Sequence, residues 1–194
     1  MKVRDSGMPE ADYWETLFDI PLILDALGVN NSVSNAVEFG CGHGTFAVPA
    51  AHRIVGRLYA LDLEPDMIEA TRRRAEREGV TNLELIQRDF IGQGTGLTDE
   101  SVDYAMLFNI LHAEEPLILL REARRILRPG GHVGVIHWNY DPATPRGPSM
   151  DIRPRPEDCR QWVEDAGFVV EQPYINLPPH HYGILGRKEK RSRR

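Results

Sequence analysis

The residues best suited to chemistry begin with a glycine-rich loop, Glu38-Phe39-Gly40-Cys41-Gly42-His43-Gly44. An apolar run at 36–39, typical of a buried strand, leads into it, and a helical pattern follows. Glycines at alternate positions permit a tight turn and let a ligand approach the backbone closely, because no Cβ atoms stand in the way. The dinucleotide fingerprint Gly-x-Gly-x-x-Gly is absent, since position 45 is Thr. The loop therefore predicts a ligand site but disfavours an NAD-dependent oxidoreductase; a simple turn is the alternative.

Two carboxylates follow the next two predicted strands. Asp62 comes directly after the run 57–61, and Asp89 follows 83–87. The carboxyl ends of parallel strands meet at one edge of a sheet, so we expect the loop and both acids at that edge. Asp62 is placed to accept hydrogen bonds from two ribose hydroxyls, or else to cap the helix that begins near Pro65. Asp89 is placed to accept from an adenine amino group, with a solvated loop as the alternative.

Strand-like runs and helical patterns alternate along the chain. The expected strands are 36–39, 57–61, 83–87, 102–108, 132–138, 168–172 and 181–186. The expected helices are 11–28, 45–54, 66–78, 115–127 and 158–166. This order predicts an α/β fold with a Rossmann-like, seven-stranded, mostly parallel sheet and helices on both faces. The last strand is expected to be antiparallel, because no helix separates it from the strand before.

Composition and charge exclude several classes of protein. The 194 residues are 41% hydrophobic and 27% charged, and two cysteines are too few for a disulfide scaffold. The net charge is −6, but the last eight residues carry +5, which leaves −11 on the body and disfavours a nucleic-acid partner. The sequence shows neither a membrane-spanning run nor a signal-peptide core, so we expect a cytoplasmic protein that does not bind membranes.

Taken together, these segments resemble the class I S-adenosylmethionine-dependent methyltransferases, in particular small-molecule members of the type 11 or ubiquinone-biosynthesis-like kind. The resemblance covers 36–138 and rests on VEFGCGHGTF, LYALDLEPDMIEATRRRA, IQRDF, VDYAMLFNILH and LLREARRILRPGGHVGVIHW. It implies an enzyme that uses S-adenosylmethionine as its cofactor and methylates a small-molecule acceptor by in-line displacement at the sulfonium methyl. A catalytically silent module or partner subunit that binds the cofactor is the alternative.

The resemblance also implies a set of cofactor-binding residues. Glu38 and the glycines would hold the methionine portion, Asp62 the ribose, and Asp89 the adenine edge. The whole implied set is Glu38, Gly40, Gly42, Gly44, Asp62, Leu63, Met67, Asp89, Phe90 and Asn109, with Tyr13 and Trp14 in an N-terminal lid. Core packing is the alternative for Trp14. Cys41 and His43 occupy variable positions of the motif, so we expect them to be spacers.

The acceptor side of the site is expected beyond the fourth and fifth strands. A sulfonium methyl is already activated, so the enzyme must mainly align the acceptor, and it needs a general base only when the acceptor arrives protonated. His112, just past the fourth strand, is the candidate base. The other candidate acceptor residues are His137, Trp138, Tyr140, Arg146, His181 and Tyr182. A structural role is the alternative for each histidine.

Other features of the chain limit the class of methyl acceptor and indicate the domain boundaries. Asn109-Ile110-Leu111-His112 stands where an Asn-Pro-Pro-Tyr segment would indicate methylation of adenine or glutamine. The proline-rich stretch 140–156 suits a loop over the acceptor, and its arginines 146, 153 and 155 suit an anionic acceptor or a solvated linker. No metal site is expected. We expect one methyltransferase domain over 1–186, with a lid region at 1–30, and a basic, disordered tail over 187–194.

Overall fold

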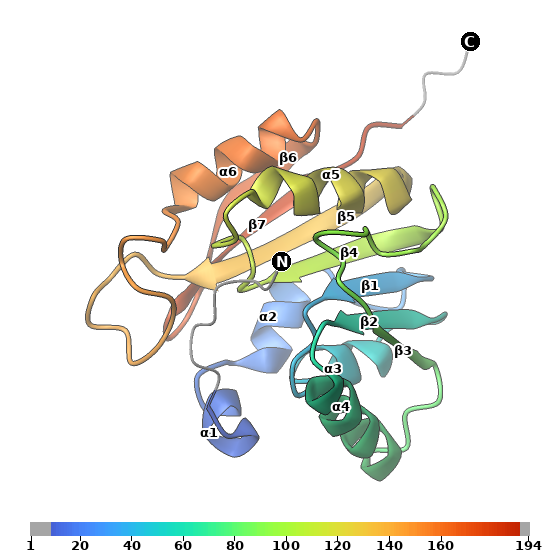
Figure 1. Cartoon of the computed structure of the whole chain (residues 1–194). Coiled ribbons are helices and arrows are strands. Elements are labelled where there is room, and N and C mark those ends of the chain that lie inside the picture. The colour runs from blue at the N-terminus through green and yellow to red at the C-terminus, as the bar shows by residue number, and fades with distance from the viewer. Residues whose placement is uncertain (1–8, 191–194) are drawn as a thin grey trace.

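The computed structural model describes residues 9–190, and these build one seven-stranded sheet (Figure 1). The strands are β1 (Ala36–Phe39), β2 (Leu58–Asp62), β3 (Leu83–Gln87), β4 (Val102–Phe108), β5 (Leu127–Trp138), β6 (Val169–Leu177) and β7 (His181–Arg187). Their order in the sheet is β3-β2-β1-β4-β5-β7-β6. β1 to β5 pair in parallel, whereas β7 runs antiparallel to β5 and to β6. The predicted fold class is confirmed, including the antiparallel last strand.

Helices cover both faces of this sheet. They are α1 (Ala11–Glu15), α2 (Ile20–Ala26), α3 (Ala47–Ala51), α4 (Pro65–Arg77), α5 (Pro116–Ile126) and α6 (Pro156–Asp165). Figure 1 shows α1 to α4 on one side and α5 and α6 on the other, with α1 at the margin of its layer. Within residues 9–190, no helix has the length and apolar composition that a bilayer crossing requires.

Alternation along the central strands builds a separate core on each side. Tyr104, Met106 and Phe108 of β4 face the α2–α3 side, whereas Ala105 and Leu107 face α5 and α6. Successive strand residues point to opposite faces, so a continuous apolar strand such as β4 fills both cores.

Two predicted helices are shorter than expected. The segment 11–28 forms two helices, because Asp19 caps α2 by accepting the Leu22 N–H at 3.1 Å and Pro21 occupies the first turn. The segment 45–54 is helical only over α3.

The chain is ordered beyond the expected boundary at residue 186. β5 begins at Leu127, five residues before the prediction, because Leu127 already pairs with Val102 of β4. Gly130 and Gly131 exchange backbone hydrogen bonds with Lys188 at 2.8 Å each. Arg187 pairs with Glu171, and the Lys188 ammonium donates to the Leu127 carbonyl at 2.7 Å. The predicted tail is therefore wrong at its first residues, and 191–194 lie outside the described part of the chain.

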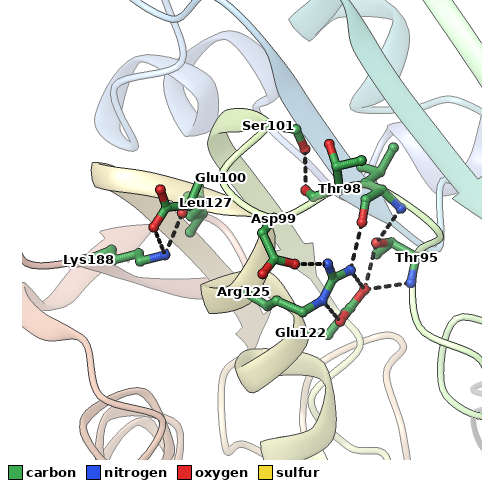
Figure 2. A network of polar contacts seen from close by, with 10 residues as sticks. Thr95, Thr98, Asp99, Glu100, Ser101, Glu122, Arg125, Leu127 and Lys188 are labelled. Carbon is green, nitrogen blue, oxygen red and sulfur yellow. Dashed lines mark hydrogen bonds and ion pairs between the residues drawn. The ribbon is translucent and has the colours of Figure 1, made fainter.

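A polar network joins the loop before β4 to α5 (Figure 2). Glu122 Oε1 accepts from the Thr95 hydroxyl at 2.6 Å and from the Thr95 N–H at 2.7 Å. Arg125 donates to Glu122, to Asp99 and to the Leu97 carbonyl. Burial alone would raise the pKa of Glu122, but these donors lower it to about 2. The network fixes the loop that leads into the central strand.

Glu122→Gln is expected to lower the free energy of unfolding at pH 7 by about 1–3 kcal/mol, because it weakens charge-assisted hydrogen bonds of a side chain that is only 13% exposed. The folded pKa lies below the unfolded value of 4.5, so this stabilisation is present above pH 4.5 and is lost between pH 4.5 and 2. Urea unfolding followed by circular dichroism at several pH values measures the effect.

The control is Glu69→Gln, because Glu69 is 51% exposed and pairs with arginines of its own helix. Its effect is expected to stay within about 0.5 kcal/mol. A difference between wild type and Glu122→Gln that persists unchanged at pH 2.5 would contradict the assigned role.

Candidate active site

The glycine loop forms a tight turn at the carboxyl end of β1. The N–H groups of Gly40 and Cys41 both donate to the Leu61 carbonyl at 2.8 Å, and the Gly42 N–H donates to Asp62 Oδ2 at 2.9 Å. Gly40 has a φ of +76°, and a Cβ there would lie 3.0 Å from the Ile110 side chain. Only glycine meets both requirements without strain.

Asp62 is half-buried at the end of β2 and holds two elements together. Besides Gly42, it accepts the Glu64 N–H at 3.0 Å, at the residue that precedes α4. Burial raises the pKa of Asp62, while the N–H donors of Glu64, Gly42 and Leu63 lower it. A carboxylate has about four acceptor positions, and these three donors leave at least one for a ligand hydroxyl. Asp62 can therefore bind a ribose and also hold the start of α4, which are the two roles that the sequence left as alternatives.

Glu38 lies beneath the loop and is 2% exposed. Burial and then the nearby Asp62 charge raise its pKa well above the usual range, although the Ala47 N–H lowers it. Its Oε2 has no hydrogen-bond partner within residues 9–190. A buried carboxylate oxygen of this kind is suited to a cationic ammonium group of a ligand.

The unpaired buried polar atoms gather at the carboxyl edge of the sheet. Across the described part of the chain there are seven, and they belong to Glu38, Thr45, Asn109, His137 and His181. Glu38 and His137 are the next-to-last residues of β1 and β5, Thr45 follows the glycine loop, Asn109 follows β4, and His181 begins the antiparallel β7 beside Trp138. An unpaired buried polar group costs about 1–3 kcal/mol, so such clustering indicates a site that a ligand completes.

Asn109 has a strained backbone at this edge. Its φ is +54°, which is uncommon for a residue other than glycine, and its N–H donates to the Ile136 carbonyl at 2.9 Å. Both polar atoms of its side-chain amide are buried and unpaired. Strain of this kind is typical of functional sites.

The adenine-edge residues are split between the core and the surface. Phe90 is buried, and its ring lies 5.7 Å from that of Phe39. Asp89 is half-exposed, and the Gly92 N–H, which it accepts at 2.9 Å, lowers its pKa. Leu63 and Met67 are half-buried at the end of β2 and in α4. The positions are consistent with the predicted pocket wall.

His112 and His137 form a pair at the ends of β4 and β5. His137 Nε2 lies 3.4 Å from His112 Nδ1. His137 is fully buried, and burial, followed by the charges of His112 and His181, lowers its pKa well below the usual range. His112 is 7% exposed and closer to the surface. Of the two, His112 is better placed to exchange a proton with an acceptor.

The N-terminal segment, residues 9–19, covers part of the carboxyl edge of the sheet, here called the rim. Trp14 is buried against Phe18 and Trp138, with ring centroids 5.1 and 5.9 Å away. Tyr13 is 45% exposed and lies under the Arg146 guanidinium at 5.7 Å. Trp14 therefore packs in the core, whereas Tyr13 meets the proline-rich loop.

Two contacts that the sequence did not predict fasten this segment. The His43 ring lies 3.2 Å from the Pro9 carbonyl, so His43 joins the segment to the glycine loop instead of serving only as a spacer. Glu15 pairs with Arg74 of α4. A cavity of about 330 Å³ lies between α1 and α4 with His43 in its wall. A larger one, about 540 Å³, lies at the opposite edge of the sheet, near Gly131.

Two of the expected acceptor residues serve the scaffold. The Tyr182 hydroxyl donates to the Pro154 carbonyl at 3.1 Å beneath α6, so a role at the acceptor rim is wrong for this side chain. Tyr140 lies in the loop after β5, where Arg155 stacks on its ring at 3.9 Å.

Arg153 was expected to meet an anionic acceptor or solvent, but it is buried. Its guanidinium donates to the carbonyls of Asn139, Asp141, Arg146 and Pro148 and to the Thr144 hydroxyl. It thus shapes the 139–155 loop from within. Among residues 9–190, no group of three or more histidine, cysteine or acidic side chains is arranged to hold a metal ion.

Several known proteins are similar to this chain in sequence. A family model described as a methyltransferase domain matches residues 36–131, about half of the chain. An uncharacterized protein of a Streptomyces fradiae transposon is 33% identical over 134 residues, which are 68% of this chain and 37% of that protein. Ribosomal protein L11 methyltransferase of Yersinia pseudotuberculosis is 32% identical over 114 residues, or 58% of this chain and 36% of that protein.

Solved structures share the fold over nearly the whole chain. A SAM-dependent methyltransferase from Aquifex aeolicus superposes with a TM-score of 0.80 at 22% identity, over 92% of this chain and 93% of that one. By contrast, the chain spans only about two fifths of the length of the curated relatives it matches. The chain therefore belongs to the methyltransferase-domain family, and its fold is that of the S-adenosylmethionine-dependent methyltransferases.

Proposed function

We propose that this chain transfers a methyl group from S-adenosylmethionine to a small-molecule acceptor at the carboxyl edge of its sheet. The observation that supports this best is the gathering of seven unpaired buried polar atoms at that edge, next to a glycine loop fixed by Asp62. Elsewhere among residues 9–190, buried side-chain polar atoms have partners. The unpaired atoms at the carboxyl edge therefore mark the place where a ligand would supply the missing hydrogen-bond partners.

The donor side of the site suits S-adenosylmethionine group by group. Glu38 Oε2 would accept from the ammonium of the methionine portion, and a free position of Asp62 would accept from a ribose hydroxyl. Phe90 would pack against the adenine, with Leu63 and Met67 at its flanks. The cofactor supplies a sulfonium methyl that a nucleophile displaces without further activation.

On the acceptor side, His112 would take a proton from an acceptor that arrives protonated. For that, His112 Nδ1 would donate to His137 Nε2, which leaves His112 Nε2 as the nitrogen that takes up the proton. A neutral His137 is compatible with this, because its single proton can lie on Nδ1. Orientation of the acceptor would supply much of the remaining rate.

A small acceptor is favoured over a protein because the rim is nearly closed. Trp138 and His181 are fully buried under the N-terminal segment, and Trp14 and Phe18 are 7 and 8% exposed. A protein substrate would need an open groove for its backbone. The L11 methyltransferases show that relatives with protein substrates exist, so acceptor screens should include ribosomal protein as well as metabolites.

Asp62→Ala is expected to weaken binding of S-adenosylhomocysteine by at least tenfold, because it removes both the diol acceptor and the acceptor of the Gly42 N–H. Isothermal titration calorimetry measures the affinity, and circular dichroism checks that the fold is retained.

Asp66→Ala is the matched control. Asp66 is exposed in the first turn of α4, and its substitution removes the same charge at a nearby position. Its affinity should stay within twofold of wild type. Equal affinities for wild type and Asp62→Ala would refute the assigned cofactor site.

His112→Ala is expected to lower the rate of methyl transfer by about 10²–10⁴ with little change in cofactor affinity, as for removal of a general base. The acceptor is first found by a labelled-methyl screen of a metabolite extract. His52→Ala, at an exposed position, is the control. A loss of less than threefold would exclude His112 as the base, and cofactor binding without turnover on any acceptor would favour a silent module.

A further inference from the structure

His181 is a buried polar side chain that the proposed reaction does not yet use. It is the first residue of β7, is 0% exposed, and pairs in the sheet with Trp138, the last residue of β5. Neither nitrogen of its ring has a hydrogen-bond partner within residues 9–190. A phenylalanine would fill the same space without leaving two buried polar atoms unpaired, so packing alone does not explain an imidazole here.

Aromatic rings enclose this imidazole. The Phe18 ring stacks on it at 4.5 Å between centroids and 27° between planes, and the Trp138 ring lies 4.2 Å away. Phe18 in turn contacts Trp14 and Phe46, each at 5.1 Å. The imidazole therefore lies against the flat apolar face of the Phe18 ring.

The imidazole of His181 is a hydrogen-bonding group and not a base. Burial, followed by the charges of His180 and Arg153, lowers its pKa to about 3. At physiological pH it is neutral, with one N–H donor and one bare nitrogen. A neutral hydroxyl or carbonyl group can hydrogen-bond to such a ring. A carboxylate or ammonium group could do so too, but burying its charge among these aromatic rings would cost more free energy.

The aromatic rings over His181 belong to the N-terminal segment, which packs in the core through Trp14, Leu17 and Phe18. Trp14 and Phe18 both lie in the N-terminal segment, at the margin of the helix layer in Figure 1. Its polar attachments are the contacts Pro9–His43, Glu15–Arg74 and Tyr13–Arg146. Movement of this segment would uncover His181 and Trp138 together.

From these contacts we infer the class of acceptor, an inference that rests on the proposed methyl transfer. The acceptor is a planar, mostly apolar ring that takes the place of the Phe18 ring against His181 and Trp138. A neutral hydroxyl or carbonyl group on that ring hydrogen-bonds to the His181 imidazole. His181 is then a residue that determines specificity, distinct from His112, which handles the proton.

The test compares three small probes on the full chain saturated with S-adenosylhomocysteine. They are p-cresol, toluene, which lacks the hydroxyl, and 4-methylcyclohexanol, which lacks the planar ring. Titrations followed by ligand-observed NMR give each affinity. We expect p-cresol to bind about three- to tenfold more tightly than either of the others, as one hydrogen bond or one stacking contact would give.

Three variants assign that preference to His181. His181→Phe should abolish the preference for p-cresol over toluene, and His181→Asn, which keeps a donor and an acceptor, should restore part of it. His180→Phe is the control, because the neighbouring His180 ring is half-buried and lies 6.3 Å from Trp138. Each variant must keep the wild-type affinity for S-adenosylhomocysteine, and His181→Leu replaces His181→Phe if the latter does not fold.

The outcomes separate this inference from the function on which it rests. If S-adenosylhomocysteine does not bind the wild-type chain, the methyltransferase proposal itself fails. If it binds, but p-cresol and toluene bind equally, no probe binds, or His181→Phe keeps the preference, the aromatic acceptor is excluded and methyl transfer to another acceptor stands.

Discussion

The carboxyl edge of the sheet is organised around one hydrogen bond, from the Gly42 N–H to the Asp62 carboxylate. It joins the loop after β1 to the end of β2, and the same carboxylate accepts the Glu64 N–H at the start of α4. Three elements therefore share one anchor. A ligand that binds across this edge would meet groups already held in position, which lowers the entropy cost of binding.

Buried polar side chains are hydrogen-bonded beside α5 but partly unpaired at the carboxyl edge. Beside α5, Glu122 and Arg125 are bonded to each other and to the loop before β4, so that network stabilises the fold without a ligand (Figure 2). At the carboxyl edge, Glu38, Asn109 and His181 keep buried atoms unpaired. These unpaired atoms destabilise the fold. Natural proteins leave buried polar atoms without partners mainly at functional sites, so the unpaired atoms indicate a site.

The sheet and the contact between the glycine loop and Asp62 were predictable because they follow from short-range patterns. Apolar runs predicted β1 to β4 with bounds within one residue of those observed, and the spacing from the glycine loop to Asp62 placed both at one edge. Contacts between distant segments leave no such pattern. The hydrogen bond of His43 to the Pro9 carbonyl and the placement of Tyr182 beneath α6 depend on the packed fold. For the same reason, the pairing of Gly130 with Lys188 was missed.

The buried Arg153 links the proline-rich loop to the chemistry of the rim. Its guanidinium is held by backbone carbonyls of that loop, so its positive charge is fixed in place without contacting an acceptor. Burial and then neighbouring histidines lower the pKa of His137 and of His181, and the Arg153 charge makes a smaller contribution in the same direction. His112 is nearer the surface than either ring and is therefore the histidine better placed to meet an acceptor. The loop that the sequence suggested as an acceptor contact thus uses the Arg153 guanidinium to hold its own backbone.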